Sequence, residues 1–523
     1  MTFRNRTRRS ARLAVAVALA AGAGLSGIAA CGGSQEPAAS AVFVSGNEDQ
    51  LYSEGLRARR AGDLERAEQA FLEATQANPR YIAAWIALGS LHRSTGRHED
   101  ARDAYARAVS IQERNVDAQL GLAQAEAELQ NIEAANRAAG RAAELAQASR
   151  LSDVEGEALR VLAAMQILTG DSEGAIGSLE RTLQLDSTNV QARVTLAELY
   201  DAQGRRNDAV RLLSMAASTM NDVEGLLHIG RTFHSFGMMD RSAEVLGRAY
   251  EIDPDHDTVG FLLASANLDL GNRDLAVSLA SRVISRNPDY LDAYVVRGQG
   301  TMRRVDTARA RTEAGAIREA LNRARPDAEF VLSRDPEHYG ALVLLGQIQH
   351  GLGETDEALA TWQTALTSAP GRRTAAALAT EAELARGNHE AVVAILEPRI
   401  EHFSRDLELR ERLGRSLIES GRYADGAATL TTVAEERRTD AELHHLVART
   451  ALDHPGTVSS EQALAHAQEA IAHGGNMRIA YRVALIDALR ANGRASEALR
   501  YATDSLRDFP ENPQLLDRIE EMR

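Results

Sequence analysis

The sequence predicts an all-α chain, built as a solenoid in which one helix–turn–helix unit is repeated many times. Ala, Leu, Arg and Glu dominate the 523 residues, and all four are strong helix formers. Aromatic residues make up only 4%, so the helices have small side chains with which to pack closely. The same pattern of Gly, Ala and aromatic residues returns 34 residues later, for example from Gly62 to Gly96, as expected for a repeat protein.

The first thirty residues have the three parts of a secretory signal. Five arginines and no acidic residue lie in this segment, all within the first twelve positions. Residues 13–25 follow as an apolar stretch rich in Ala and Gly, which is too short for a permanent membrane span. Residues 1–30 are therefore expected to be an export signal. Residues 7–11 also look like a twin-arginine motif, which leaves the general and the twin-arginine export routes both open.

The signal is followed by Ile28-Ala29-Ala30-Cys31, which resembles the lipobox of bacterial lipoproteins. Cys31 is the one cysteine of the chain, so it cannot form an intramolecular disulfide. The alternative is a chance cysteine behind an ordinary signal. The resemblance implies that Cys31 is lipidated and that residues 31–47 form a lipidated, flexible tether. Gly32, in place of Asp, implies sorting to the outer membrane if the organism has one, with the folded part facing the periplasm.

The body of the chain carries the repeat. In the first two copies the pattern consists of Gly62, Ala67, Phe71, Ala74 and Pro79, then Trp85, Leu88, Gly89, Gly96, Ala101, Tyr105 and Ala108. Later copies include Leu196, Ala197, Tyr200 and Gly204, then Leu345, Gly346, Gly353, Ala358, Trp362 and Pro370. This pattern resembles the tetratricopeptide repeat, and the resemblance covers residues 48–512 with about 12–13 repeats. It implies a right-handed superhelical solenoid of tandem helix–turn–helix repeats.

Several stretches depart from the pattern. Insertions are expected near residues 145–155, 303–323 and 453–461, and the second of these is expected to lengthen the helices of its repeat. The repeats at 116–149 and 373–406 are degenerate. Residues 513–523 are expected to form a polar helix that caps the C-terminal end of the solenoid.

The sequence offers no motif for catalysis. It has no G-x-S-x-G and, because it contains no Lys, no G-x-x-x-x-G-K-[ST] phosphate loop. His444, His445, His466 and His473 are the candidates for a metal site, but they lack the tight spacing or the Cys and carboxylate partners of such sites. The prediction is a protein that is not an enzyme and has no cofactor and no metal.

The charge of the chain argues against nucleic acid as a partner. The formal net charge is −15, and all 59 basic residues are Arg. Without the five arginines of residues 1–30, 54 Arg stand against 74 acidic residues, a net of −20. A basic protein partner would suit this charge, although charge also serves solubility.

The resemblance implies that the first helix of each repeat lines a groove that binds proteins. Residues predicted to face this groove are Ile86, Ser90, Arg93, Val194, Glu198, Asp201, Leu227, Arg231, His234, Phe261 and Ser265. The Lys/Asn/Arg clamp of chaperone-binding members is absent, since there is no Lys. The expected function is a non-catalytic scaffold in an envelope assembly, secretion or export machine. The alternative is a glycan- or peptidoglycan-binding envelope factor, against which the scarcity of aromatic residues argues.

Overall fold

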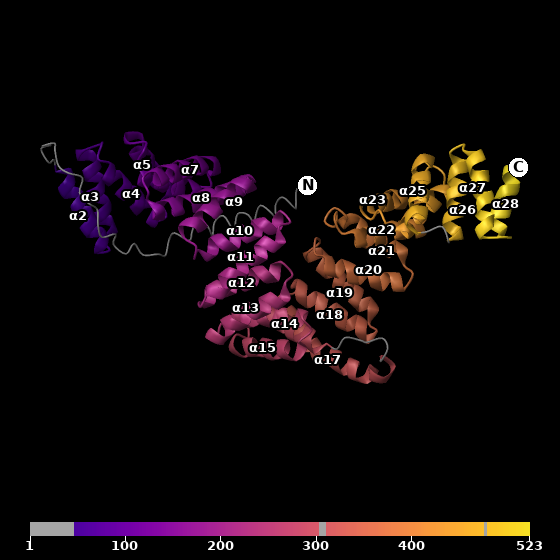
Figure 1. Cartoon of the computed structure of the whole chain (residues 1–523). Coiled ribbons are helices and arrows are strands. Elements are labelled where there is room, and N and C mark those ends of the chain that lie inside the picture. Colours follow the sequence, from indigo (N-terminus) through magenta and orange to yellow (C-terminus); the bar gives the residue numbers. More distant parts are fainter. Residues whose placement is uncertain (1–46, 303–309, 475–477) are drawn as a thin grey trace. The chain divides into compact units, whose positions relative to one another are not determined.

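The computed structural model describes residues 47–302, 310–474 and 478–523, and throughout this part of the chain the regular structure is helical (Figure 1). The signal, Cys31 and nearly all of the tether lie outside the described residues. The described residues divide into two compact units, one that ends at Leu270 and one that begins at Gly271. Among the described helices, none combines the length and the hydropathy that a bilayer crossing requires.

The first unit is a run of helices that alternate between a first and a second helix of each repeat. They are α2 (Glu48–Arg60), α3 (Leu64–Ala77), α4 (Ile82–Ser94), α5 (His98–Ile111), α6 (Val116–Glu128), α7 (Ile132–Ala148), α8 (Ser152–Thr169), α9 (Ser172–Leu185), α10 (Val190–Ala202), α11 (Arg206–Thr219), α12 (Val223–Ser235), α13 (Met239–Ile252) and α14 (Asp257–Asp269). Even-numbered helices are the first helices. Each helix packs on the one that precedes it and the one that follows it within the unit.

The second unit continues the alternation. Its elements are α15 (Arg273–Arg286), α16 (Leu291–Thr301), α17 (Ala310–Arg334), α18 (Tyr339–Leu352), α19 (Thr355–Ser368), α20 (Arg373–Ala385), α21 (His389–Leu396), the 3₁₀ helix η1 (Glu397–Arg399), α22 (Leu407–Glu419), α23 (Tyr423–Glu436), α24 (Ala441–Asp453), α25 (Ser460–Gly474), α26 (Ile479–Ala491), α27 (Ala495–Asp508) and α28 (Pro513–Met522). Together with the first unit, it makes the protein an all-α solenoid, as predicted.

Local sequence explains where the helices begin and end. A typical first helix has 13 residues and a typical second helix 14, as in α4 and α5. The turn between these two contains Gly96, whose φ of 76° lies in the left-handed region that glycine adopts at little cost. Many helices start at an Asp or Asn whose side chain accepts a hydrogen bond from the first turn, such as Asp63 from the amide of Arg66 at 3.1 Å.

Within each unit, the core consists of clusters of small and large side chains packed between the helices. Tyr105 of α5 is 4% exposed, and its ring lies against two glycines on the neighbouring first helices. A Cβ on Gly89 would come within 3.0 Å of this ring, and a Cβ on Gly121 within 2.2 Å. The ring therefore fills the space that both glycines leave, so each repeat is held by the next one.

The irregular stretches are accommodated mostly by changes in helix length. Near residues 145–155 the structure has no long joint, because α7 and α8 grow to 17 and 18 residues and meet at Arg150, whose φ is 58°. The Ala-rich sequence of α7 favours this extension. In the second unit α17 has 25 residues, while α21 has only 8 and gives way to η1 at Pro398. A proline has no amide hydrogen to continue the helix, which explains the early end of α21.

Candidate functional site: the first-helix face and a hollow between second helices

The predicted groove residues all lie on first helices, and most of them are partly exposed. Places are counted here from the first residue of each first helix. Ile86, Ser90 and Arg93 occupy the fifth, ninth and twelfth places of α4, and each is partly exposed. Phe261 and Ser265 hold the fifth and ninth places of α14 and are also partly exposed. These side chains form part of what we call the first-helix face.

Two predicted groove residues are buried instead. Val194 is 1% exposed and Leu227 is 6% exposed, so the expectation that they face a partner is wrong. The same burial occurs in other repeats, where four further aliphatic residues at the fifth place are buried, although Ile86 is not. These four are Leu120, Val295, Val343 and Val483. Neighbouring first helices such as α10 and α12 contact each other, and a branched side chain at the fifth place is buried as the repeats stack.

The charged groove residues connect one repeat to the next. The guanidinium of Arg93 on α4 lies 3.3 Å from the carboxylate of Glu128 in the following repeat. Asp201 on α10 pairs with Arg206 at 2.9 Å, and Arg206 also donates to the carbonyl of Phe236 at 2.8 Å. These bonds orient the side chains at the first-helix face and leave them partly accessible.

His234 joins two predicted residues on neighbouring helices. Its Nε2 lies 3.4 Å from the hydroxyl of Ser265 and 3.8 Å from the carboxylate of Asp269, both on α14. Arg231, one turn earlier on α12, is exposed. The structure thus brings His234 and Ser265 together, and Arg231 is the predicted residue most open to a partner.

Glu198 differs from the other acidic residues of this face. It occupies the ninth place of α10 and is largely buried, and burial raises the pKa of its carboxyl to about 7. Among the described residues, neither a hydrogen bond nor an ion pair holds this side chain. A cation brought to Glu198 would favour its ionised form.

The C-terminal histidines lie on two adjacent helices. His444 on α24 contacts His466 on α25, with 2.8 Å between their Nδ1 atoms, while His473 pairs with Glu469 at 3.1 Å. In the described parts of the chain, no three or more His, Cys, Asp or Glu side chains are placed to hold a metal ion together. The geometry is that of a buried hydrogen-bonded pair.

Sequence reasoning missed the first-helix face of the second unit. Asp487 at the ninth place of α26 lies between Arg449 of α24, at 3.1 Å, and Arg518 of α28, at 2.6 Å. Glu411 at the fifth place of α22 similarly binds Arg415 and Arg437, at 2.8 and 2.6 Å. The turn glycines of these repeats define the same places as in the first unit, so the same count could have found them.

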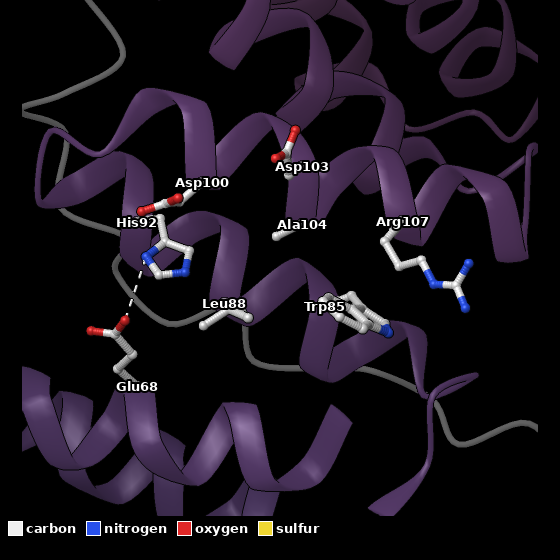
Figure 2. A pocket seen from close by; sticks show the side chains of 8 residues that line it. All are labelled: Glu68, Trp85, Leu88, His92, Asp100, Asp103, Ala104 and Arg107. Carbon is white, nitrogen blue, oxygen red and sulfur yellow. Dashed lines mark ion pairs between the residues drawn. The ribbon is translucent and has the colours of Figure 1, made fainter. Parts of the chain in front are cut away.

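The structure also has a hollow that the sequence did not indicate. It lies between the second helices α3 and α5, with α4 as its floor, and has a volume of about 490 Å³ (Figure 2). Its lining consists of Glu68, Trp85, Leu88, His92, Asp100, Asp103, Ala104 and Arg107. The side chains come from three helices of two repeats, which explains why no local sequence pattern revealed them.

Comparison with known proteins agrees with this architecture. One family model described as a tetratricopeptide repeat matches residues 52–116 and 318–373, and a second of the same description matches 166–226 and 383–450. An uncharacterized protein of Methanocaldococcus jannaschii is 32% identical over 64 residues, which are 12% of this chain and 74% of that protein.

Two solved structures match parts of this chain at low sequence identity. A thermophilic tetratricopeptide repeat protein of Thermus thermophilus is 22% identical, with a TM-score of 0.34, over 38% of this chain and 99% of that one. A tetratricopeptide repeat protein of Parabacteroides merdae is 19% identical, with a TM-score of 0.36, over 49% and 98%. The family matches and the repeated helix pairs agree: this chain belongs to the tetratricopeptide repeat family, and its repeats form a scaffold for protein–protein interaction.

Proposed function

We propose that this chain is a non-catalytic scaffold anchored by lipid to the bacterial cell envelope, where it holds together the components of an assembly, secretion or export machine. The observation that carries the proposal is Cys31, the one cysteine of the chain, which directly follows Ile28-Ala29-Ala30 and an apolar stretch. Two or more acyl chains on one cysteine hold a protein durably on a membrane. The folded repeats would then face the periplasm, on the outer membrane where there is one.

The first-helix face is the surface on which we expect protein partners to bind. Arg231, His234 and Ser265 present polar groups within two adjacent repeats of the first unit, and Glu198 lies two repeats before Ser265. With a net charge of −20 outside residues 1–30, the chain as a whole suits a basic partner.

The anchor is tested by labelling cells with radioactive palmitate. The chain with Cys31 should take up the label and sediment with membranes, whereas Cys31→Ser should remain unlabelled and leave the membrane fraction. Ser34→Ala, a change in the same tether, serves as the matched control and should behave like the unchanged chain. Equal labelling of the Cys31→Ser variant would contradict a lipid on this residue.

The binding face is tested with a photo-crosslinking amino acid in native membranes. It replaces Arg231, which is exposed on the first helix α12, or Met215, which is 54% exposed on the second helix α11. We expect defined envelope proteins to be crosslinked from Arg231 and fewer from Met215. If neither position captures protein while the purified chain sediments with peptidoglycan sacculi, the glycan-binding alternative replaces the scaffold.

A further inference from the structure

We propose that the hollow between α3 and α5 binds an arginine side chain of a protein partner. This is a second contact site, made by second helices and separate from the first-helix face. It relies on the protein-binding nature of the repeats and is independent of the lipid anchor. Three features of the hollow point to this ligand: its lining, its charge, and one buried nitrogen that has no hydrogen-bond partner among the described residues.

The hollow has an apolar floor. Trp85 and Leu88 on α4 and Ala104 on α5 lie in its middle and at one end (Figure 2). The indole nitrogen of Trp85 donates to the carbonyl of Pro79 at 3.0 Å, which fixes the ring, and the ring remains partly exposed. Such a floor suits the aliphatic part of an arginine side chain, which packs on apolar surface while its charge stays among polar groups.

The charge of the hollow is divided between its ends. Figure 2 shows Asp100, His92 and Glu68 at one end and Arg107 beside Trp85 at the other. Along α4, the seven helical steps from Trp85 to His92 cover about 10 Å, which matches an extended arginine side chain together with its backbone. A guanidinium would lie at the acidic end, and the backbone carbonyl of the same residue would lie near Arg107.

Not every carboxylate of the hollow is neutralised by a strong ion pair. Glu68 is already neutralised by Arg97, whose guanidinium makes two bonds to it at 2.6 and 2.7 Å. Among the described residues, Asp103 is bonded only to the neighbouring Arg102, at 2.7 Å, and because its side chain is 69% exposed this pair is weak and open to exchange. Asp100, among the described residues, has no ion pair. A planar guanidinium offers several donors in a fixed arrangement and so can meet two carboxylates at once.

A buried ring nitrogen of His92 is a second, independent observation that points to a ligand. The residue is only 6% exposed and lines the hollow, yet its Nδ1 has no hydrogen-bond partner in the part of the chain that the structure describes. Burial, followed by the charge of Arg97, lowers the pKa of His92, so the ring is neutral at pH 7. When the proton of the neutral ring is on Nε2, Nδ1 is an acceptor without a donor, which is an unfavourable arrangement in a buried place.

A guanidinium would supply the missing donor. Nδ1 of His92 lies 3.9 Å from Oε1 of Glu68. One donor nitrogen can therefore lie about 2.9 Å from both acceptors at the same time, which is hydrogen-bond distance. Nδ1 of His92 and Oε1 of Glu68 are too far apart to bond to each other, but their separation allows them to share one donor. The acidic end of the hollow is therefore complementary to an N–H group that carries a positive charge.

The proposal is tested by nuclear magnetic resonance on the full chain with ¹⁵N-labelled tryptophan. The chain has two tryptophans, Trp85 in the hollow and Trp362, which is 1% exposed in the second unit. The probe is N-acetyl-L-arginine amide, and its uncharged counterpart is N-acetyl-L-citrulline amide. We expect the arginine probe to shift the indole signal of Trp85 saturably and to leave that of Trp362 unchanged, with no saturable shift from the citrulline probe.

Variants identify the groups responsible. The double variant Asp100→Asn, Asp103→Asn should weaken the affinity for the arginine probe by at least about tenfold. Glu357→Gln, an exposed acid at the third residue of the second helix α19, is the matched control and should leave the affinity unchanged. Circular dichroism and the unchanged Trp362 signal verify that the variants are folded. Equal binding of the citrulline probe, full affinity in the double variant, or the absence of a saturable shift would each overturn the proposal.

Discussion

The imidazole of His466 donates a hydrogen bond to that of His444, with 2.8 Å between their Nδ1 atoms. The direction follows from a third group, since Nε2 of His444 lies 3.1 Å from the carbonyl oxygen of Arg438, which can only accept. The proton of neutral His444 is therefore on Nε2, its Nδ1 is the acceptor, and His466 carries its proton on Nδ1. The two rings, 5% and 8% exposed, form an ordered pair that has no place for a further proton between them.

This pair predicts that the second unit loses stability in acid. Burial, and next the neighbouring His444, lower the pKa of His466 to about 4, whereas in an unfolded chain a histidine has a pKa of about 6.5. Between these two values the unfolded chain binds a proton that the folded chain does not, so the free energy of unfolding falls as the pH decreases from about 6.5 to 4.

The prediction is checked by thermal unfolding at pH 7.5 and pH 5.0, followed by circular dichroism. His466→Gln retains an N–H donor toward His444 but cannot titrate, so its loss of stability between the two pH values should be smaller than that of the unchanged chain. His473→Gln, at an exposed position of the same helix, should keep the original pH dependence. An equal loss of stability in His466→Gln would show that the pair is not responsible.

The backbone of Gln130 is strained, and we expect its replacement by glycine to stabilise the chain. It occupies the position where Gly96 and Gly62 lie one and two repeats earlier, and its φ is 61°. A residue with a Cβ in this region is strained by roughly 1 kcal/mol relative to glycine, and the side chain of Gln130 is exposed, so its removal sacrifices little packing. We expect Gln130→Gly to raise the free energy of unfolding by about 0.5–1 kcal/mol in urea titrations, and Gly96→Gln to lower it by a similar amount. A loss of stability in Gln130→Gly would contradict the strain.

The same turn shows how much of the fold the sequence could predict. The 34-residue spacing of Gly62 and Gly96 was enough to predict helix pairs, because glycine at a left-handed turn is a local requirement. The repeat from 116 to 149 appeared degenerate, yet it keeps the turn geometry with Gln130, since stacking on its neighbours fixes the backbone there. Local sequence signals were thus sufficient to predict that most of the repeats exist.

The surface was less predictable because it depends on contacts between repeats. Val194 and Leu227 occupy places that face a partner by simple count, but packing between adjacent first helices buries them. The hollow around Trp85 needs Glu68 from the previous repeat, and no spacing rule within one repeat could have indicated that combination. Residues that act within a repeat can be inferred from sequence, whereas sites made by two repeats require the structure.

Gly346 on α18 allows the close approach of α19, the second helix of the same repeat. A Cβ at this position would lie 2.2 Å from the indole nitrogen of Trp362, a ring that is 1% exposed. Gly346→Ala should therefore lower the free energy of unfolding by about 1–3 kcal/mol through overpacking and alter the fluorescence of Trp362. Gly177→Ala, in the middle of α9 with nothing within 4 Å, should instead stabilise the chain by up to about 1 kcal/mol. Equal effects of the two substitutions would argue against a close helix contact.

Glu198 predicts a pH dependence opposite in sign to that of the histidine pair. Burial raises the pKa of its carboxyl to about 7, while the unfolded chain ionises this group near pH 4.3. As the pH rises between these values, the unfolded chain releases a proton that the folded chain retains, so the free energy of unfolding decreases and is lowest above pH 7. Glu198→Gln removes this penalty. It should match the unchanged chain near pH 4.5 and exceed its stability at pH 8 by up to about 3 kcal/mol.

Urea unfolding at pH 4.5 and pH 8 measures this difference, with Glu251→Gln on α13, an exposed acid, as the control that should gain nothing at either pH. A gain for Glu198→Gln that is equal at both pH values would mean that improved packing, and not the buried charge, is the cause. If the gain is confined to high pH, the unchanged chain keeps a destabilising carboxylate on the first-helix face. A basic partner group placed beside Glu198 would then relieve that penalty, and its binding would release a proton near neutral pH.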